Sequence, residues 1–204
     1  FIDTLWRDHP RTEHLGLFSD YHEFLLQKGL EPDLDAPGGK IFSDRLRGNL
    51  PVNLQMASFV TSKAVDFIER NSGRPFILYV SLLEPHPPFA RPHKDVYDPA
   101  TLPVDPTFLK KPKGASLFNR VRSDYYMSMS SLGEDAITES EGYDLTTETG
   151  WRRLRANYFG NVTPIDNAVG NIVGALGRTG IADDTAIVFT SEHGDMMGSH
   201  AMLN

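Results

Sequence analysis

Cysteine is missing from this sequence of 204 residues, and so is any long uninterrupted apolar run. Without cysteine, the chain can form neither a disulfide framework nor a thiolate metal site. A membrane-spanning helix needs an apolar run of about 18 residues or more, so the sequence predicts no membrane span. Basic residues are also few, with 20 Lys and Arg against 27 Asp and Glu, for a net charge of -7. Because nucleic-acid binding relies on clustered Lys and Arg, we expect no nucleic-acid partner.

The rest of the composition is that of a globular protein, 40% hydrophobic and 23% charged. The chain begins at Phe1 rather than Met, and its first residues lack the basic and apolar regions of a signal peptide. It stops at Asn204, directly after a segment dense in motifs. We therefore expect residues 1–204 to be an internal part of a longer polypeptide. A partial sequence of this kind does not determine the oligomeric state. It also does not determine whether the protein is secreted, periplasmic or cytoplasmic.

Two stretches with helical periodicity each precede a short apolar run. The first helix is predicted over 56–70 and the second over 151–178, where Pro164 either kinks one helix or begins another. The runs that follow, 76–83 and 186–190, have the length and continuous hydrophobicity of strands buried on both faces. Helix followed by buried strand is the unit of a layered α/β domain, so we expect a mainly parallel central sheet with flanking helices.

The other regions are rich in turn signals and read as long loops. Residues 1–50 contain one short predicted helix, Tyr21 to Gln27, which Gly29 is placed to end. Residues 84–150 are expected to be mostly irregular, with a polar surface loop from Ser128 to Thr149.

Polar side chains follow both predicted strands. After the first, His86 lies between Pro85 and Pro87, which restrict the backbone; a histidine held in this way can hydrogen-bond an anionic oxygen or pass a proton. The alternative, without a functional role for His86, is a proline-rich turn. In open α/β sheets, ligands bind at the carboxyl ends of strands, so this position suits a site.

After the second strand, Glu192, His193, Asp195 and His200 lie within nine residues. Carboxylate and imidazole groups of this kind are ligands for divalent metals. A metal would supply the positive charge that an acidic protein needs to bind an anionic substrate. The alternative, without a metal site, is a strand end followed by a polar loop.

Taken in order, these segments resemble the sulfatase family of the alkaline phosphatase superfamily. The resemblance rests on Pro85-His86-Pro87-Pro88-Phe89, on the helix with Tyr158-Phe159 and Ile165-Asp166, and on Phe189 to His200. It covers roughly residues 50–110 and 150–204. The closing motif is most similar to the branch of choline-sulfatase-like enzymes, arylsulfatases and phosphonate monoester hydrolases. The implied fold is an alkaline-phosphatase-like layered α/β fold, of which this chain would be an incomplete catalytic domain.

The resemblance implies roles for four residues. Glu192 and His193 match the pair that binds a divalent metal, calcium or alternatively manganese. His86 matches a catalytic, substrate-binding histidine, and His200 a supporting substrate-binding histidine. This chain departs from the family pattern at several positions: Glu192 replaces the usual Asp, Ser199 and Ala201 replace an acidic residue and glycine, and Pro164 is unusual in its helix.

The implied activity is cleavage of a sulfate ester, on a small anionic ester or a sulfated carbohydrate. The family's nucleophile is a formylglycine in a motif that this sequence lacks, so we expect it upstream in the longer polypeptide. A catalytic lysine is expected just beyond Asn204, and the chain alone is expected to be inactive. A phosphonate or phosphate ester hydrolase of the same fold, a degenerate binding protein and a plain structural domain remain the alternatives.

Overall fold

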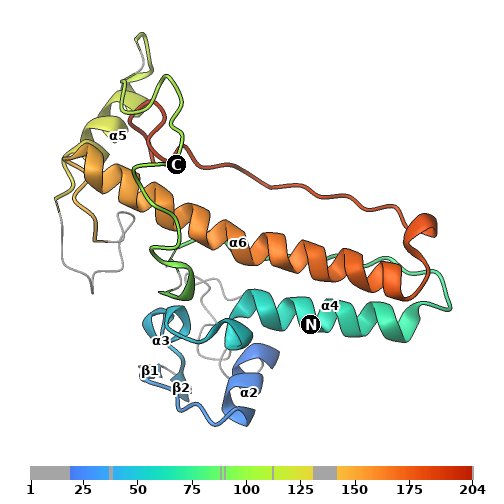
Figure 1. Cartoon of the computed structure of the whole chain (residues 1–204). Helices are drawn as coiled ribbons and strands as arrows, with labels where there is room; N and C mark the ends of the chain where they lie inside the picture. Colours follow the sequence, from blue (N-terminus) through green and yellow to red (C-terminus); the bar gives the residue numbers. More distant parts are fainter. Residues whose placement is uncertain are drawn as a thin grey trace.

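The structure is a computed structural model, which describes residues 19–36, 39–87, 89, 91–111, 113–130 and 142–203. Two long helices lie side by side and carry smaller structured parts near their N-terminal ends (Figure 1). The elements are α2 (Asp20–Gln27), β1 (Leu34–Ala36), β2 (Gly39–Ile41), α3 (Asp44–Gly48), η2 (Val52–Leu54), α4 (Met56–Asn71), η3 (Arg91–His93), α5 (Leu117–Met127), α6 (Glu148–Arg178) and η4 (Ala182–Asp184).

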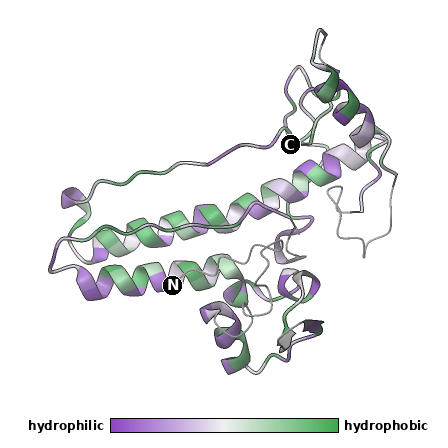
Figure 2. Ribbon diagram, turned by 180° about the vertical axis from the view of Figure 1, so that it is seen from behind, coloured by the Kyte–Doolittle hydropathy of each residue, from purple (hydrophilic) through white to green (hydrophobic). Residues whose placement is uncertain are grey.

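The two long helices, α4 and α6, run in the same direction. Ile68 near the end of α4 packs against Ala175 and Leu176 near the end of α6, and Arg178 reaches Glu69 at 3.2 Å. Hydrophobic and hydrophilic bands alternate along both helices (Figure 2), as expected for helices with one buried face. Both predicted helices are therefore confirmed.

The helix α6 is one continuous helix of 31 residues with Pro164 inside it. The Thr147 side chain caps its start by accepting a hydrogen bond from the Gly150 amide at 3.1 Å. Of the two alternatives that the sequence left open at Pro164, the structure has the single helix.

The two apolar runs that were predicted as strands are extended and run parallel to each other. Residues 75–83 return from the end of α4 to its start, and residues 185–195 return along α6 as far as Tyr158 (Figure 1). Burial alternates along the first run, so that Phe76 and Leu78 pack on the helices while Ile77 is 97% exposed. In the second run, Val188 is 87% exposed.

The predicted parallel sheet is not seen in the part of the chain that the structure describes. The sheet there is the antiparallel pair β1–β2, with Leu34 opposite Ile41, and a single further bridge joins Phe108 to Ser199. The prediction that 76–83 and 186–190 are buried on both faces fails here, because the helices cover one face of the first run and little of the second. A parallel sheet that includes these runs stays a prediction.

The N-terminal part packs around the start of α4. The predicted helix appears as α2, with Ser19 as its cap and Gly29 in the left-handed conformation just beyond its end. The core of this N-terminal part contains the buried side chains of Tyr21, Leu25, Phe42, Leu50 and Phe59.

A second core lies at the start of α6 and includes Phe89, Tyr126, Trp151, Leu154, Met197 and Leu203. The helix α5 packs here, although the sequence predicted irregular structure over 84–150. The side chain of Ser116 caps α5 by accepting from the Asn119 amide at 3.2 Å. This helix was missed because Tyr126 is its one buried large apolar residue, while Leu117, Phe118 and Val121 are exposed. Among the helices of the described ranges, none is long and apolar enough to cross a membrane.

Candidate functional site

The first extended run ends at Glu84, whose side chain lies at the N-terminus of α4. The backbone amide of Ala57, in the first turn of α4, donates a hydrogen bond to the Glu84 carboxylate. Burial raises the pKa of Glu84, because the loss of hydration of the charged form outweighs the hydrogen bonds from backbone amides. This contact fixes the point at which the chain leaves the extended run and enters the loop of His86.

The backbone of His86 is held on both sides, while its ring is exposed. Its amide donates to the Leu83 carbonyl at 3.1 Å, and its carbonyl accepts from Asn161 Nδ2 on α6 at 3.4 Å. The ring nitrogen Nδ1 lies 2.6 Å from the Pro87 carbonyl oxygen. In the tautomer in which Nδ1 carries the hydrogen and donates it to Pro87, Nε2 remains available to a ligand.

Further along the chain, residues 93–95 make close backbone contact with α6. The amide of Asp95 donates to Asn157 Oδ1 at 2.8 Å. At Gly160, a Cβ atom would lie 2.1 Å from the backbone oxygen of His93, so glycine is required for this approach. The side chains of Asn157 and Asn161 are each only 1% exposed.

Sequence reasoning missed this docking face of α6. The available signal was two asparagines four residues apart, Asn157 and Asn161, with Gly160 between them on a helix that is otherwise amphipathic. Asn161 also begins the sequence Asn161-Val162-Thr163, which fits a glycosylation pattern, but its side chain is buried on this helix.

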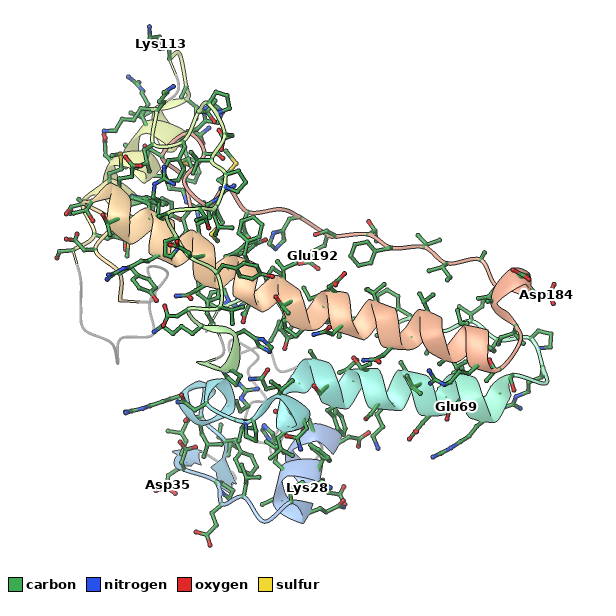
Figure 3. The ribbon with its side chains drawn as sticks, in the orientation of Figure 1. Lys28, Asp35, Glu69, Lys113, Asp184 and Glu192 are labelled. Atoms are coloured by element: carbon green, nitrogen blue, oxygen red, sulfur yellow. The ribbon has the colours of Figure 1, made fainter. Side chains whose placement is uncertain are left out.

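The second cluster presents Glu192 and His193 as an exposed pair. Glu192 lies on the extended segment beside α6 (Figure 3), and its Oε1 lies 3.5 Å from His193 Nε2. The other ring nitrogen, Nδ1, lies 3.2 Å from the Gly194 carbonyl oxygen. If Nδ1 carries the hydrogen and donates it to Gly194, the lone pair of Nε2 faces the carboxylate. Two acceptors that face each other favour a cation between them, either a proton or a metal ion.

The donor set of this pair fits part of a divalent metal site. It supplies one carboxylate and one imidazole, which suit calcium or manganese as two ligands among several. Within the described ranges, no group of three or more His, Cys, Asp or Glu side chains is arranged to hold a metal ion. The remaining ligands would therefore have to come from elsewhere.

Asp195 points away from this role and toward α6. It accepts a hydrogen bond from the hydroxyl of Tyr158, whose ring also packs edge-on against Phe89 with centroids 6.3 Å apart. Burial, together with the charge and the hydrogen bond of Asp195, raises the pKa of Tyr158 to about 12. One turn earlier on α6, Arg155 Nη1 donates to the Met197 carbonyl at 3.3 Å.

His200 lies in a strained turn beyond the second cluster. Met197, His200 and Ala201 have φ values of 43°, 55° and 55°, in the left-handed region that non-glycine residues rarely adopt. The turn is anchored on the segment of Asp105, whose carboxylate accepts from Ser199 Oγ at 2.5 Å.

The anchor of this turn is reinforced by backbone hydrogen bonds. The Leu109 amide donates to the Gly198 carbonyl at 2.8 Å, and the His200 amide donates to the Thr107 carbonyl at 3.0 Å. The hydrogen bonds from Ser199 and Thr107 hold the pKa of Asp105 well below its usual range.

A hollow of about 450 Å³ lies beside this turn. It is lined by Lys113, Gly114, Ala115, Asn119, Met196, His200 and Met202. Of the four predicted site residues, His200 alone is part of this lining. The substrate-binding role of His200 therefore stays a prediction.

The structure brings both strand-end clusters to one stretch of α6. Asn161 holds the loop of His86, and Tyr158, three residues earlier, holds the loop of Glu192 and His193 through Asp195. Residues three apart on a helix are neighbours, so the two clusters dock within about one turn of each other. A shared site between His86 and the Glu192–His193 pair stays a prediction that this arrangement supports.

Known proteins similar to this chain are several times longer than the part they share with it. The chain is 31% identical over 159 residues to the multifunctional alkaline phosphatase superfamily protein PehA of Trinickia caryophylli, covering 76% of this chain and 30% of PehA. It is 30% identical to an arylsulfatase of Clostridium perfringens, with 72% and 28% covered. It is 33% identical to a choline-sulfatase of Rhizobium meliloti, with 64% and 23% covered. The chain thus spans under a third of each of these relatives.

The chain is similar to known proteins in both fold and sequence. The structure superimposes on a phosphonate monoester hydrolase from Silicibacter pomeroyi with a TM-score of 0.67 and 22% identity, over 98% of this chain and 44% of that one. At this identity the likeness shows the fold alone. The sequence model of the Sulfatase family matches residues 38–203. The chain therefore belongs to the sulfatase family, within the alkaline phosphatase superfamily.

Proposed function

We propose that this chain is part of the catalytic domain of a metal-dependent hydrolase that cleaves sulfate esters. The observation that carries the proposal is the convergence of two separate loops, those of His86 and of Glu192–His193, on the segment of α6 between Tyr158 and Asn161. Membership in the sulfatase family and similarity to an arylsulfatase and a choline-sulfatase support it. The expected substrate is a small anionic ester or a sulfated carbohydrate.

Each predicted residue then has a physical task. Glu192 and His193 would hold a divalent cation, calcium or alternatively manganese, as two of its ligands. When bound, the cation supplies positive charge that stabilises negative charge developing on the sulfate oxygens. As an imidazolium, which carries a hydrogen on both ring nitrogens, His86 would donate from Nε2 to an ester oxygen while Nδ1 donates to the Pro87 carbonyl and so sets the ring orientation. His200 would support substrate binding at the edge of the site.

The nucleophile is expected in a different part of a longer polypeptide. The chain spans only 30% of PehA, which leaves room for the upstream formylglycine motif and for further metal ligands. We propose that residues 1–204 are a partial catalytic domain and that this chain alone does not turn over substrate.

A phosphonate or phosphate ester hydrolase is the second candidate. PehA is described as multifunctional, and the structural neighbour is a phosphonate monoester hydrolase. Sulfate and phosphonate esters present similar tetrahedral anions, so His86, Glu192 and His193 would serve either substrate.

The test is an assay of the longer polypeptide with calcium or manganese on an aryl sulfate and on an aryl phosphonate monoester. We expect hydrolysis of the sulfate, and a loss of about 100-fold or more in His86→Ala, since a positioned proton donor contributes roughly 10²–10⁴-fold. Tyr125→Phe, at an exposed position on α5, is the matched control and should keep full activity. Faster turnover of the phosphonate would favour the second candidate. Correctly folded protein without activity on either ester would indicate a binding protein that has lost the chemistry.

A further inference from the structure

Tyr158 contacts both loops of the proposed site. Its ring packs edge-on against Phe89 in the first loop, with an interplanar angle of 85°, and its hydroxyl donates a hydrogen bond to Asp195 in the second. The first loop carries His86 three residues before Phe89, and the second carries His193 two residues before Asp195. One side chain on a long helix therefore touches the two segments that hold the proposed catalytic and metal-binding residues.

Two neighbours of Tyr158 on α6 each bind one of the two loops. Asn161 binds the first loop, through the carbonyl of His86, and Arg155 binds the second loop, through the carbonyl of Met197. Tyr158 lies between these two positions and at the edge of the core, where it is half-buried. Its apolar ring and polar hydroxyl suit a place between an aromatic core and a carboxylate.

We propose that Tyr158 is a positioning residue that couples the two loops, so that the placement of the His193 loop depends on the placement of the His86 loop. The catalytic meaning of this coupling rests on the proposed function, but the coupling itself does not. It is a property of the chain without metal or substrate.

Hydrogen exchange can measure this coupling because each loop contains hydrogen-bonded amides. The His86 amide donates to the Leu83 carbonyl at 3.1 Å, and the amides of Met196 and Met197 donate to the Leu203 carbonyl at 3.0 Å. Their exchange rates report how often each loop opens. The Ile68 amide, in α4 near its far end, provides an internal reference for changes in global stability.

The first experiment uses Tyr158→Phe in the 204-residue chain, followed by NMR. This change keeps the ring and removes the hydrogen bond to Asp195. We expect exchange at Met196 and Met197 to rise about two- to tenfold relative to Ile68, as the loss of one hydrogen bond predicts, and exchange at His86 to rise as well. Tyr125→Phe, the matched control, should change none of these rates.

The second experiment asks whether a change in the first loop reaches the second through Tyr158. Phe89→Leu removes the edge-on ring contact and should raise exchange at Met196 and Met197. Phe89 and Met197 belong to the same hydrophobic core, so a direct effect has to be separated from an effect through Tyr158. The double variant with Tyr158→Phe makes this separation.

Coupling through Tyr158 predicts that Phe89→Leu adds little further exchange at Met197 once the hydroxyl is gone. The proposal is overturned if the effect of Phe89→Leu persists at full size in the Tyr158→Phe background. It is also overturned if Tyr158→Phe changes the second loop alone. Neither readout involves ester hydrolysis. The coupling can therefore be disproved while the proposed function holds, and the proposed function can be disproved while the coupling holds.

Discussion

The loop of His86 and the loop of Glu192–His193 are built in opposite ways. The first is docked at several described points, by Glu84 on the start of α4 and by α6 residues including Asn161 and Gly160. The second is extended and exposed up to Asp195. Within it, Glu192 Oε1 lies 3.5 Å from His193 Nε2. A docked backbone with an exposed ring suits a group that must be in place before the substrate arrives. An exposed pair of facing acceptors suits a site that a cation completes.

Of the substitutions that test this comparison, Gly160→Ala should change the free energy of unfolding most. The new Cβ would lie 2.1 Å from the backbone oxygen of His93, which cannot move without displacing the docked loop. We expect a loss of about 3 kcal/mol in the free energy of unfolding, at the upper end of what overpacking usually costs. Urea denaturation followed by circular dichroism provides the measurement.

Gly170→Ala is the matched control for this change. Gly170 lies on the same helix with nothing within 4 Å of the new Cβ, so alanine should stabilise the chain by about 0.5–1 kcal/mol. If both variants lose stability equally, the His86 loop is not docked on α6 as described.

A smaller effect is expected from Asp105→Asn, at the turn that follows the exposed pair. The carboxylate accepts hydrogen bonds from Ser199 and Thr107, and an amide accepts them less strongly. We expect a loss of about 1 kcal/mol at pH 7, since the group is partly exposed. Urea titrations of both proteins at several pH values measure this difference.

The pH dependence of this difference has a definite sign. The pKa of Asp105 is lowered in the folded chain from its ordinary value of 3.8, so its stabilising contribution is present above pH 3.8. It is lost as the pH falls through the lower folded value. The stability of the wild type should therefore approach that of Asp105→Asn below pH 3.8, and a difference that stays constant down to pH 2 would show that Asp105 does not carry the contact.

The sequence predicted the parts of the fold that local patterns specify. The helices now seen as α2, α4 and α6 follow from apolar periodicity and from end signals such as Gly29. The same periodicity did not reveal α5, because this helix buries little apolar surface and depends on its Ser116 cap.

Local sequence patterns could not predict contacts between residues that are far apart in the sequence. Glu84 on Ala57, Asn161 on His86 and Asp105 on Ser199 join residues between 27 and 94 positions apart. Hydrophobicity predicted extension for 76–83 and 186–190, but not which faces are covered, because burial depends on the neighbouring segments. For the candidate site, motifs predicted the residues, and the structure adds the helix on which their loops meet.

The central claim is that Glu192 and His193 hold a divalent cation that faces His86. It is tested most directly by adding Mn²⁺ to the 204-residue chain and following paramagnetic broadening of the histidine ring signals by NMR, which detects even weak binding. We predict that the His193 signals broaden first and those of His86 next, that buried His22 on α2 stays sharp, and that excess Ca²⁺ reverses the effect. Glu192→Gln should weaken the broadening at both histidines. Broadening that spares His193, or that reaches His193 without His86, would contradict the account.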